Sequence, residues 1–114
     1  MNGTRVLVAC ELQSYRQALA AAFRELRPEV EVFEAEKENL DLEVERLDPE
    51  VVVCSQLTAR VEHRAASWVE LYPCHGRRSV VSVLGERSTV EEIQLSDLLS
   101  IIDRTERATL NGAG

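Results

Sequence analysis

The sequence predicts a three-layer α/β domain with a mostly parallel central sheet. Short, continuously apolar runs rich in valine, at residues 6–10 and 51–54, are typical of strands that are buried on both faces. A third run, at residues 30–33, mixes valine with charge, as expected near a sheet edge. Helical patterns separate these strands, and the connectors are short. This alternation indicates right-handed crossovers between parallel strands.

Two helices are expected between these strands. Ser14 and Gln17 form a capping box ahead of the first, whose apolar residues repeat at helical spacing up to Leu26. Asn39 is a suitable cap for the second helix. The expected inward face of that helix consists of Leu40, Val44 and Leu47.

The second half of the chain departs from simple alternation. One or two helical turns are expected over residues 57–64. Strands at residues 68–72 and 79–84 are separated by a Pro- and Gly-containing loop that is too short for a parallel crossover. We therefore expect an antiparallel hairpin over residues 68–84, followed by a C-terminal helix that Ser96 caps.

Length and composition limit the possible functions. The 114 residues suit one domain, expected over residues 1–107, with residues 108–114 as a flexible tail. A net charge of −7 disfavours a general nucleic-acid binder, because phosphate binding needs a basic face. An odd count of three cysteines and no signal-peptide or membrane-spanning pattern predict a cytoplasmic location without membrane contact.

Three segments of the first half resemble response-regulator receiver domains, which have a flavodoxin-like fold. Residues 4–9 match their first strand, residues 16–19 the start of their first helix, and residues 47–53 the approach to their third strand. The resemblance covers about residues 4–56. It implies a receiver-like scaffold and a role in signalling.

The residues that carry receiver phosphotransfer are replaced. Cys10 and Glu11 stand at the two acidic positions, and Ser55 stands at the phosphoacceptor position. This set does not supply the carboxylates that hold Mg²⁺. Lys37, the only lysine, follows the second strand, so we expect it not to act as the lysine that receivers carry after their fifth strand. Aspartyl phosphorylation is therefore not expected, and Glu11, Ser55 and Gln56 are predicted to edge a remnant pocket.

Cys10 and Arg16 form a C-x5-R pattern directly after the first strand, as in cysteine-dependent phosphatases. That chemistry needs a loop whose N–H groups cradle phosphate and lower the pKa of the thiol. The loop here has no glycine, and Glu11 would repel phosphate. Cys10 and Cys54 are also expected at one sheet edge, where a redox pair or soft-metal site is conceivable. Neither belongs to a C-x-x-C pair, which favours inert core thiols and no metal.

Two features point to protein contacts. Residues 29–50 contain ten acidic and two basic residues, a pattern typical of a solvated face that can also steer a basic partner. Trp68 and Tyr72 are predicted to share one face of a late strand, where the final helix or a second copy of the chain would cover them. They are our candidate interface anchors.

The sequence thus predicts a non-catalytic, receiver-like interaction module that needs no cofactor. It would bind protein partners, with a homodimer as one possibility. The alternative is a small cysteine-dependent phosphatase or phosphoryl carrier that uses Cys10 and Arg16.

Overall fold

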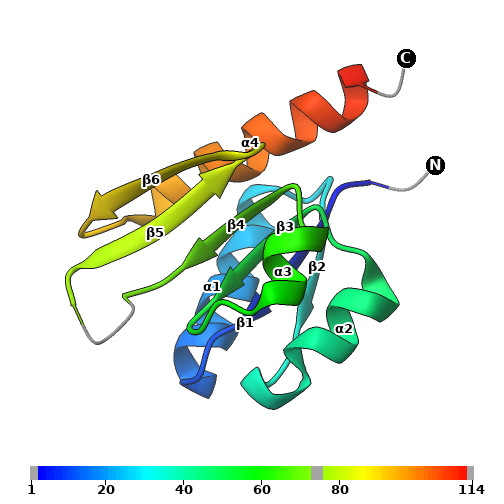
Figure 1. Ribbon diagram of the computed structural model, residues 1–114. Coiled ribbons are helices and arrows are strands. Elements are labelled where there is room, and N and C mark those ends of the chain that lie inside the picture. Colours follow the sequence, from blue (N-terminus) through cyan, green and yellow to red (C-terminus); the bar gives the residue numbers. More distant parts are fainter. Residues whose placement is uncertain (1–2, 73–75, 113–114) are drawn as a thin grey trace.

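The computed structural model describes residues 3–72 and 76–112 (Figure 1). The strands are β1 (Arg5–Ala9), β2 (Glu31–Glu34), β3 (Val51–Cys54), β4 (Ser67–Glu70), β5 (Arg78–Val83) and β6 (Glu86–Glu91). The helices are α1 (Gln13–Leu26), the short 3-10 helix η1 (Lys37–Asn39), α2 (Leu40–Leu47), α3 (Ala59–Arg64) and α4 (Leu95–Gly112).

The strands form one six-stranded mixed sheet in the order β2-β1-β3-β4-β5-β6. The first four strands are parallel, whereas β5 runs antiparallel to β4 and β6 antiparallel to β5. The predicted α/β class and the antiparallel hairpin are therefore confirmed. The sheet is less parallel than a receiver-like layout requires, because its last two strands belong to hairpins.

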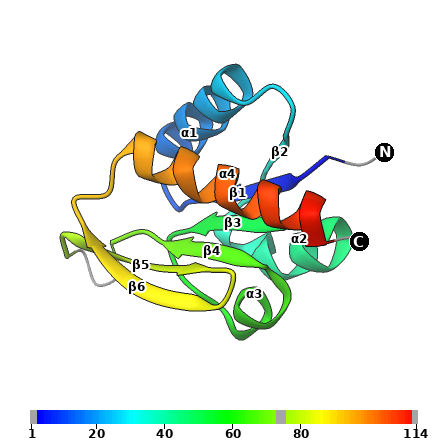
Figure 2. The same ribbon diagram turned by 90° about the horizontal axis from the view of Figure 1, so that it is seen from above.

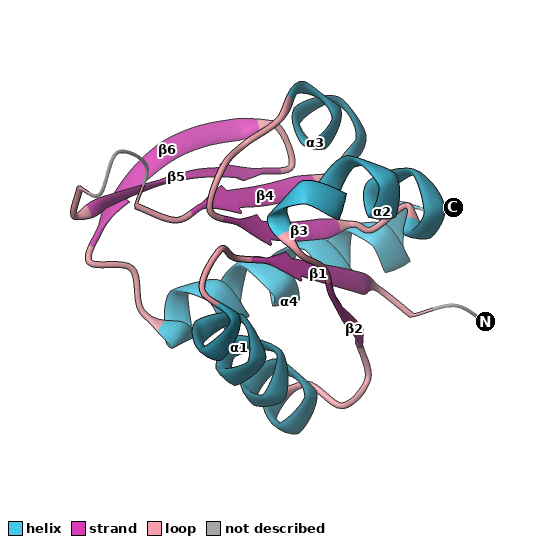
Figure 3. Ribbon diagram, turned by 90° about the horizontal axis from the view of Figure 1, so that it is seen from below, coloured by secondary structure: helices cyan, strands magenta, loops and turns pink. Residues whose placement is uncertain are grey.

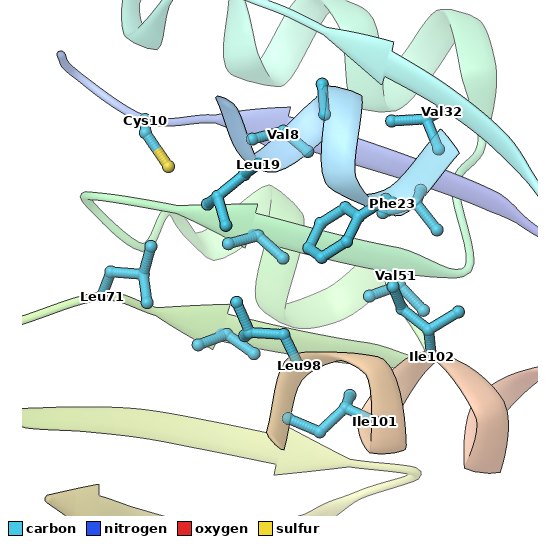
Figure 4. Packing of buried hydrophobic residues seen from close by; sticks show 14 of the residues in the cluster. Val8, Cys10, Leu19, Phe23, Val32, Val51, Leu71, Leu98, Ile101 and Ile102 are labelled. Carbon is cyan, nitrogen blue, oxygen red and sulfur yellow. The ribbon is translucent and has the colours of Figure 1, made fainter. Parts of the chain in front are cut away.

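Helices cover both faces of the sheet. Figures 2 and 3 show α1 and α4 on one face and α2 and α3 on the other. The buried residues divide into two clusters accordingly. The α1/α4 cluster includes Leu19, Phe23, Leu98, Ile101 and Ile102, several of which are drawn in Figure 4. The α2/α3 cluster includes Leu40, Val44, Leu47, Val61 and Trp68.

Strand β1 contributes side chains to both clusters, as expected for a strand that is buried on both faces. Val6 and Val8 belong to the α1/α4 cluster, whereas Leu7 and Ala9 belong to the α2/α3 cluster. Side chains alternate between the two faces of a strand, which explains this division. The continuous apolar run in the sequence is thus required by the three-layer architecture.

Strand β6 lies outside every element that the sequence predicts. All but one of its residues are exposed, so it has no apolar alternation to reveal it. It forms a hairpin with β5 through Leu84 and Gly85, which have φ angles of 52° and 92°. Positive φ at both central residues is typical of the type I′ turn, whose twist suits a two-residue hairpin.

The predicted caps of α1 and α4 are wrong. α1 already begins at Gln13, so Ser14 lies inside the helix. α4 begins at Leu95, one residue before Ser96. There the carboxylate of Asp97 accepts a hydrogen bond from the Gln94 backbone N–H at 2.9 Å, which satisfies an amide at the helix start.

The predicted tail also needs correction, because α4 continues through residues 108–112. Small and polar residues reduce helix burial but do not by themselves end a helix. The Thr109 hydroxyl donates to the Thr105 carbonyl at 2.9 Å, one turn earlier. Residues 113–114 lie outside the described part of the chain.

Candidate functional site

A groove of about 870 Å³ opens at the carboxyl ends of β1, β3 and β4. We call it the carboxyl-edge groove. Segments from five parts of the chain line it. Its lining residues are Cys10, Glu11, Leu12, Tyr15, Lys37, Ser55, Gln56, Glu70, Leu71, Tyr72 and Gly76.

The topology explains why the groove lies here. The chain leaves β1 toward the face covered by α1 and leaves β3 toward the face covered by α3 (Figure 3). Neighbouring parallel strands whose connections diverge in this way leave a crevice outside their carboxyl ends. The Glu11 backbone N–H donates to the Ser55 hydroxyl at 2.9 Å and links the two diverging loops.

The structure brings together the three residues predicted at a pocket edge. Glu11, Ser55 and Gln56 all line the groove. The Ser55 hydroxyl accepts a backbone hydrogen bond, so it helps to hold the loop that follows β1. Glu11 and Gln56 are exposed. These two side chains are therefore available to a bound partner.

Lys37 also lines the groove, a placement that the sequence did not predict. Its Nζ lies 3.9 Å from Oε1 of Glu11. β2 runs parallel to β1, and the Ala35 backbone N–H continues the ladder by donating to the Val8 carbonyl at 3.0 Å. The segment that follows β2 therefore reaches the same sheet edge as the loop after β1.

Glu70, at the end of β4, is a groove residue that sequence reasoning missed. Its Oε2 accepts the Leu57 backbone N–H at 2.9 Å and so holds the loop between β3 and α3. Among the described residues, Glu70 makes no ion pair within 4.0 Å. Its place at the carboxyl end of a parallel strand is the signal that could have identified it.

Tyr15 and Tyr72 provide the aromatic part of the lining. Tyr15 is 39% exposed, and burial of the rest of its ring raises the pKa of its hydroxyl, with smaller contributions from Tyr72 and Cys10. The Tyr72 hydroxyl donates to the Ile93 carbonyl at 3.2 Å, which ties the ring to the segment before α4. Its backbone has a φ of 47°, a left-handed conformation that turns the chain out of the strand direction.

The predicted pairing of Trp68 with Tyr72 on one strand face is wrong. β4 ends at Glu70, and the left-handed backbone at Tyr72 breaks the alternation. Trp68 packs in the α2/α3 cluster, whereas Tyr72 packs against the α1/α4 cluster. Trp68 is only 2% exposed and lies under Arg87, whose guanidinium carbon is 5.1 Å from the ring centroid. Trp68 is therefore a core residue, while an interface role for Tyr72 stays a prediction.

Cys10 and Arg16 lack the electrostatics of a phosphate-gripping pair. Cys10 is 2% exposed, and Figure 4 shows it at one end of the α1/α4 cluster. Burial raises the pKa of its thiol to about 11 despite the nearby Arg16. The Arg16 Nη1 donates to the Cys10 carbonyl at 3.3 Å, and its Nε lies 3.8 Å from Oε1 of Glu34. A thiol with a raised pKa is a poor nucleophile at neutral pH.

Cys54 points away from Cys10. It belongs to the α2/α3 cluster, whereas Cys10 belongs to the α1/α4 cluster, so the sheet separates the two side chains. Cys54 opposes Ala9 in the β1–β3 register, and Cys10, the next residue along, faces the other side. Burial raises the pKa of Cys54 to about 12. The redox-pair and shared-metal interpretations are therefore wrong for these two thiols.

No protein-family model, curated protein or solved structure matches the chain. Within residues 3–72 and 76–112, no helix has the length and apolar character needed to cross a bilayer. The fold and the groove define an α/β domain with a mixed sheet and an open crevice at its carboxyl edge.

Proposed function

We propose that the protein is a non-catalytic interaction module that binds a protein partner in the carboxyl-edge groove. The observation that carries this proposal is the groove itself, which combines exposed apolar and aromatic side chains with a few polar groups. Leu12 is 69% exposed at its rim, although large apolar side chains are usually buried. Contiguous apolar surface rimmed by polar residues marks interaction sites.

The electrostatics of the groove favour binding over covalent catalysis. The thiol of Cys10 has a raised pKa, and the Ser55 hydroxyl accepts a backbone hydrogen bond from Glu11. The exposed side chains of Leu12 and Tyr15 supply a surface for contact rather than acid–base groups that titrate near neutral pH. This arrangement suits recognition of a partner.

The resemblance to receiver domains supports a regulatory role. The parallel strands follow the order β2-β1-β3-β4, which is the first part of the flavodoxin-like order. The groove lies at the strand ends where ligands bind in such folds. β5 keeps its place in that order but runs antiparallel to β4, and β6 is added beyond it. We propose a receiver-like module in which partner binding takes the place of phosphorylation.

Affinity capture with matched variants tests the proposal. Leu12→Glu puts a charge on the groove rim, and Leu42→Glu puts the same charge on α2, outside the lining, at a residue with a similar exposure of 66%. Wild-type protein and Leu42→Glu should recover the same partner from the native lysate, and Leu12→Glu should lose it. Equal recovery by all three proteins, or no partner with any of them, would refute the proposal. Thermal denaturation of each variant checks that folding is intact.

A further inference from the structure

We propose that the groove receives a short basic segment of its partner, in which an arginine or lysine lies beside an apolar side chain. This inference rests on the proposed function, because it specifies the partner's chemistry at the same groove. It follows from the charges of the lining, the acidic surface around it and the tyrosines that form part of its wall.

The lining contains more negative than positive charge. Its described members include the carboxylates of Glu11 and Glu70 but only one cation, Lys37. The Lys37 ammonium lies near Glu11, at 3.9 Å, so it already neutralises one of the two carboxylates. Glu70 uses Oε2 for a backbone N–H, and within residues 3–72 and 76–112 its other oxygen accepts no hydrogen bond, so it can accept a further donor. A cation from the partner would complete this pairing.

Acidic residues beside the groove extend this negative surface. Glu36 and Glu38 flank Lys37 in and before η1, and both are exposed. The whole chain carries a net charge of −7. An excess of one sign of charge in and around a cleft raises the local concentration of oppositely charged ligands and their association rate. The groove is therefore favourable for a basic partner segment.

The aromatic and apolar lining suits the rest of such a segment. Arginine and lysine carry aliphatic stems that bury against apolar surface while the charged end meets a carboxylate. Leu12 offers that surface, and an arginine or lysine can also stack on the faces of Tyr15 or Tyr72. The hydrogen bond from Tyr72 to the Ile93 carbonyl restricts one ring before binding. Restricting a side chain in advance lowers the entropy cost of association.

Three features favour an anion instead: Lys37, the exposed Arg77 that follows Gly76 of the lining, and the start of α1. The first turn of this helix contains no acidic residue, and helix N-termini attract anions. Glu11 lies just before this turn, however, and Glu70 lines the same groove. These two carboxylates would repel an anion bound between them. An acidic partner segment is accordingly the outcome that would overturn the inference.

Selection from a display library of short random peptides on the purified full chain tests the inference. We expect enrichment of peptides with arginine or lysine next to leucine, isoleucine or an aromatic residue. A selected peptide should bind Glu70→Gln about tenfold more weakly than wild type, since a charge-assisted hydrogen bond is lost. Replacing its arginine by neutral citrulline should weaken binding similarly, and added NaCl should do so progressively.

Glu70→Gln keeps an amide oxygen that can accept the Leu57 N–H, so the fold should be retained. Glu25→Gln, at an exposed position in α1 outside the groove, is the matched control and should bind like wild type. Enrichment of acidic or uncharged peptides that depend on Leu12 would overturn the inference and leave the proposed function standing. If lysate capture succeeds but no peptide binds, the partner contacts the groove in another way and the inference is also overturned. Failure of the lysate capture itself would refute the proposed function.

Discussion

Replacing Thr105 by valine tests a buried chain of hydroxyl groups that joins α4 to the sheet. The Leu84 backbone N–H donates to the Ser67 hydroxyl at 3.2 Å, and the Ser67 and Thr105 hydroxyls lie 2.6 Å apart. The Thr105 hydroxyl donates to the Ile101 carbonyl at 2.8 Å. Thr105 has a single hydroxyl proton, so Ser67 must be the donor in the bond between them. Both side chains are fully buried.

Valine has the shape of threonine, so Thr105→Val opens no cavity but leaves the Ser67 proton without an acceptor. Stranding a buried donor costs about 1–3 kcal/mol, and we expect the free energy of unfolding to fall by about 2 kcal/mol. Ser67→Ala should lower the free energy of unfolding by less, about 1 kcal/mol, because the remaining donors of this hydrogen-bond chain, Leu84 N–H and the Thr105 hydroxyl, both keep an acceptor. Leu84 N–H also donates to the Ala66 carbonyl at 3.0 Å, and Thr105 keeps Ile101.

The double variant should cost about 2 kcal/mol rather than the sum of about 3, since removing Ser67 also removes the stranded donor. Urea denaturation followed by tryptophan fluorescence measures this cycle, because Trp68 is the only tryptophan and lies in the core. Far-UV circular dichroism checks for two-state behaviour. Additive costs, or a larger effect of Ser67→Ala than of Thr105→Val, would refute the assigned direction of the hydrogen bonds.

Three further predictions concern ionisable groups. Cys10 and Cys54 should react with iodoacetamide far more slowly in the folded chain than in urea, as mass spectrometry of their peptides can show, because burial raises both pKa values; equal rates would contradict their burial. The Arg27 guanidinium, 2.6 Å from Asp103, lowers the pKa of that carboxyl below its ordinary 3.8, so the pair stabilises the fold above this pH and loses its effect in more acidic solution. Asp103→Asn should therefore be less stable than wild type at neutral pH and approach it in acid, and a difference that does not change with pH would contradict the ion pair. Burial and neighbouring carboxylates raise the pKa of Glu106 above 4.5, so its charge disfavours folding at neutral pH. Glu106→Gln should stabilise the protein there in thermal denaturation, with a gain that shrinks as the pH falls toward 4.5 and below; destabilisation at neutral pH would contradict this assignment.

The parallel half of the sheet could be predicted because burial on both faces leaves a strong apolar pattern. β3 (Val51–Cys54) has the bounds that its valine run indicates. The three residues predicted to face inward from α2 are its buried residues: Leu40, Val44 and Leu47. In such elements the residues that the hydrophobic period places on one face are also those that the tertiary structure buries. The local sequence is therefore sufficient to predict them.

β6 could not be predicted in this way because backbone pairing rather than side-chain burial holds it in place. Its side chains are nearly all exposed, and its stability comes from the ladder with β5 and from the turn at Leu84 and Gly85. Gly85 was the one available signal, because glycine tolerates the positive φ that the turn requires. Leu84, at the other central position, is an apolar residue that is not typical of turns, so the pair Leu84-Gly85 does not stand out as a hairpin turn in the sequence.

Some groove residues could be predicted from the strand order, whereas others could not. Glu11 and Ser55 directly follow predicted parallel strands, so topology alone places them at one edge. Lys37 follows β2, which runs parallel to β1, so topology also brings it to this edge. Tyr72 instead reaches the groove through a left-handed backbone. The left-handed conformation has no reliable signal in residue type, because tyrosine rarely adopts positive φ.

The antiparallel half of the sheet shapes the groove that the parallel half opens. In a fully parallel sheet the chain would leave β4 through a loop into another crossover helix. Here it turns back toward β5, and Leu71 and Tyr72, at the start of this turn, contribute an apolar and aromatic wall to the groove. The Leu71 backbone N–H donates to the Cys54 carbonyl at 2.8 Å, which fixes this wall to the end of β3. Because the strand direction changes here, an apolar and aromatic surface lies where a parallel sheet would have a further polar loop. We therefore expect a partner to be recognised by shape and charge at this edge.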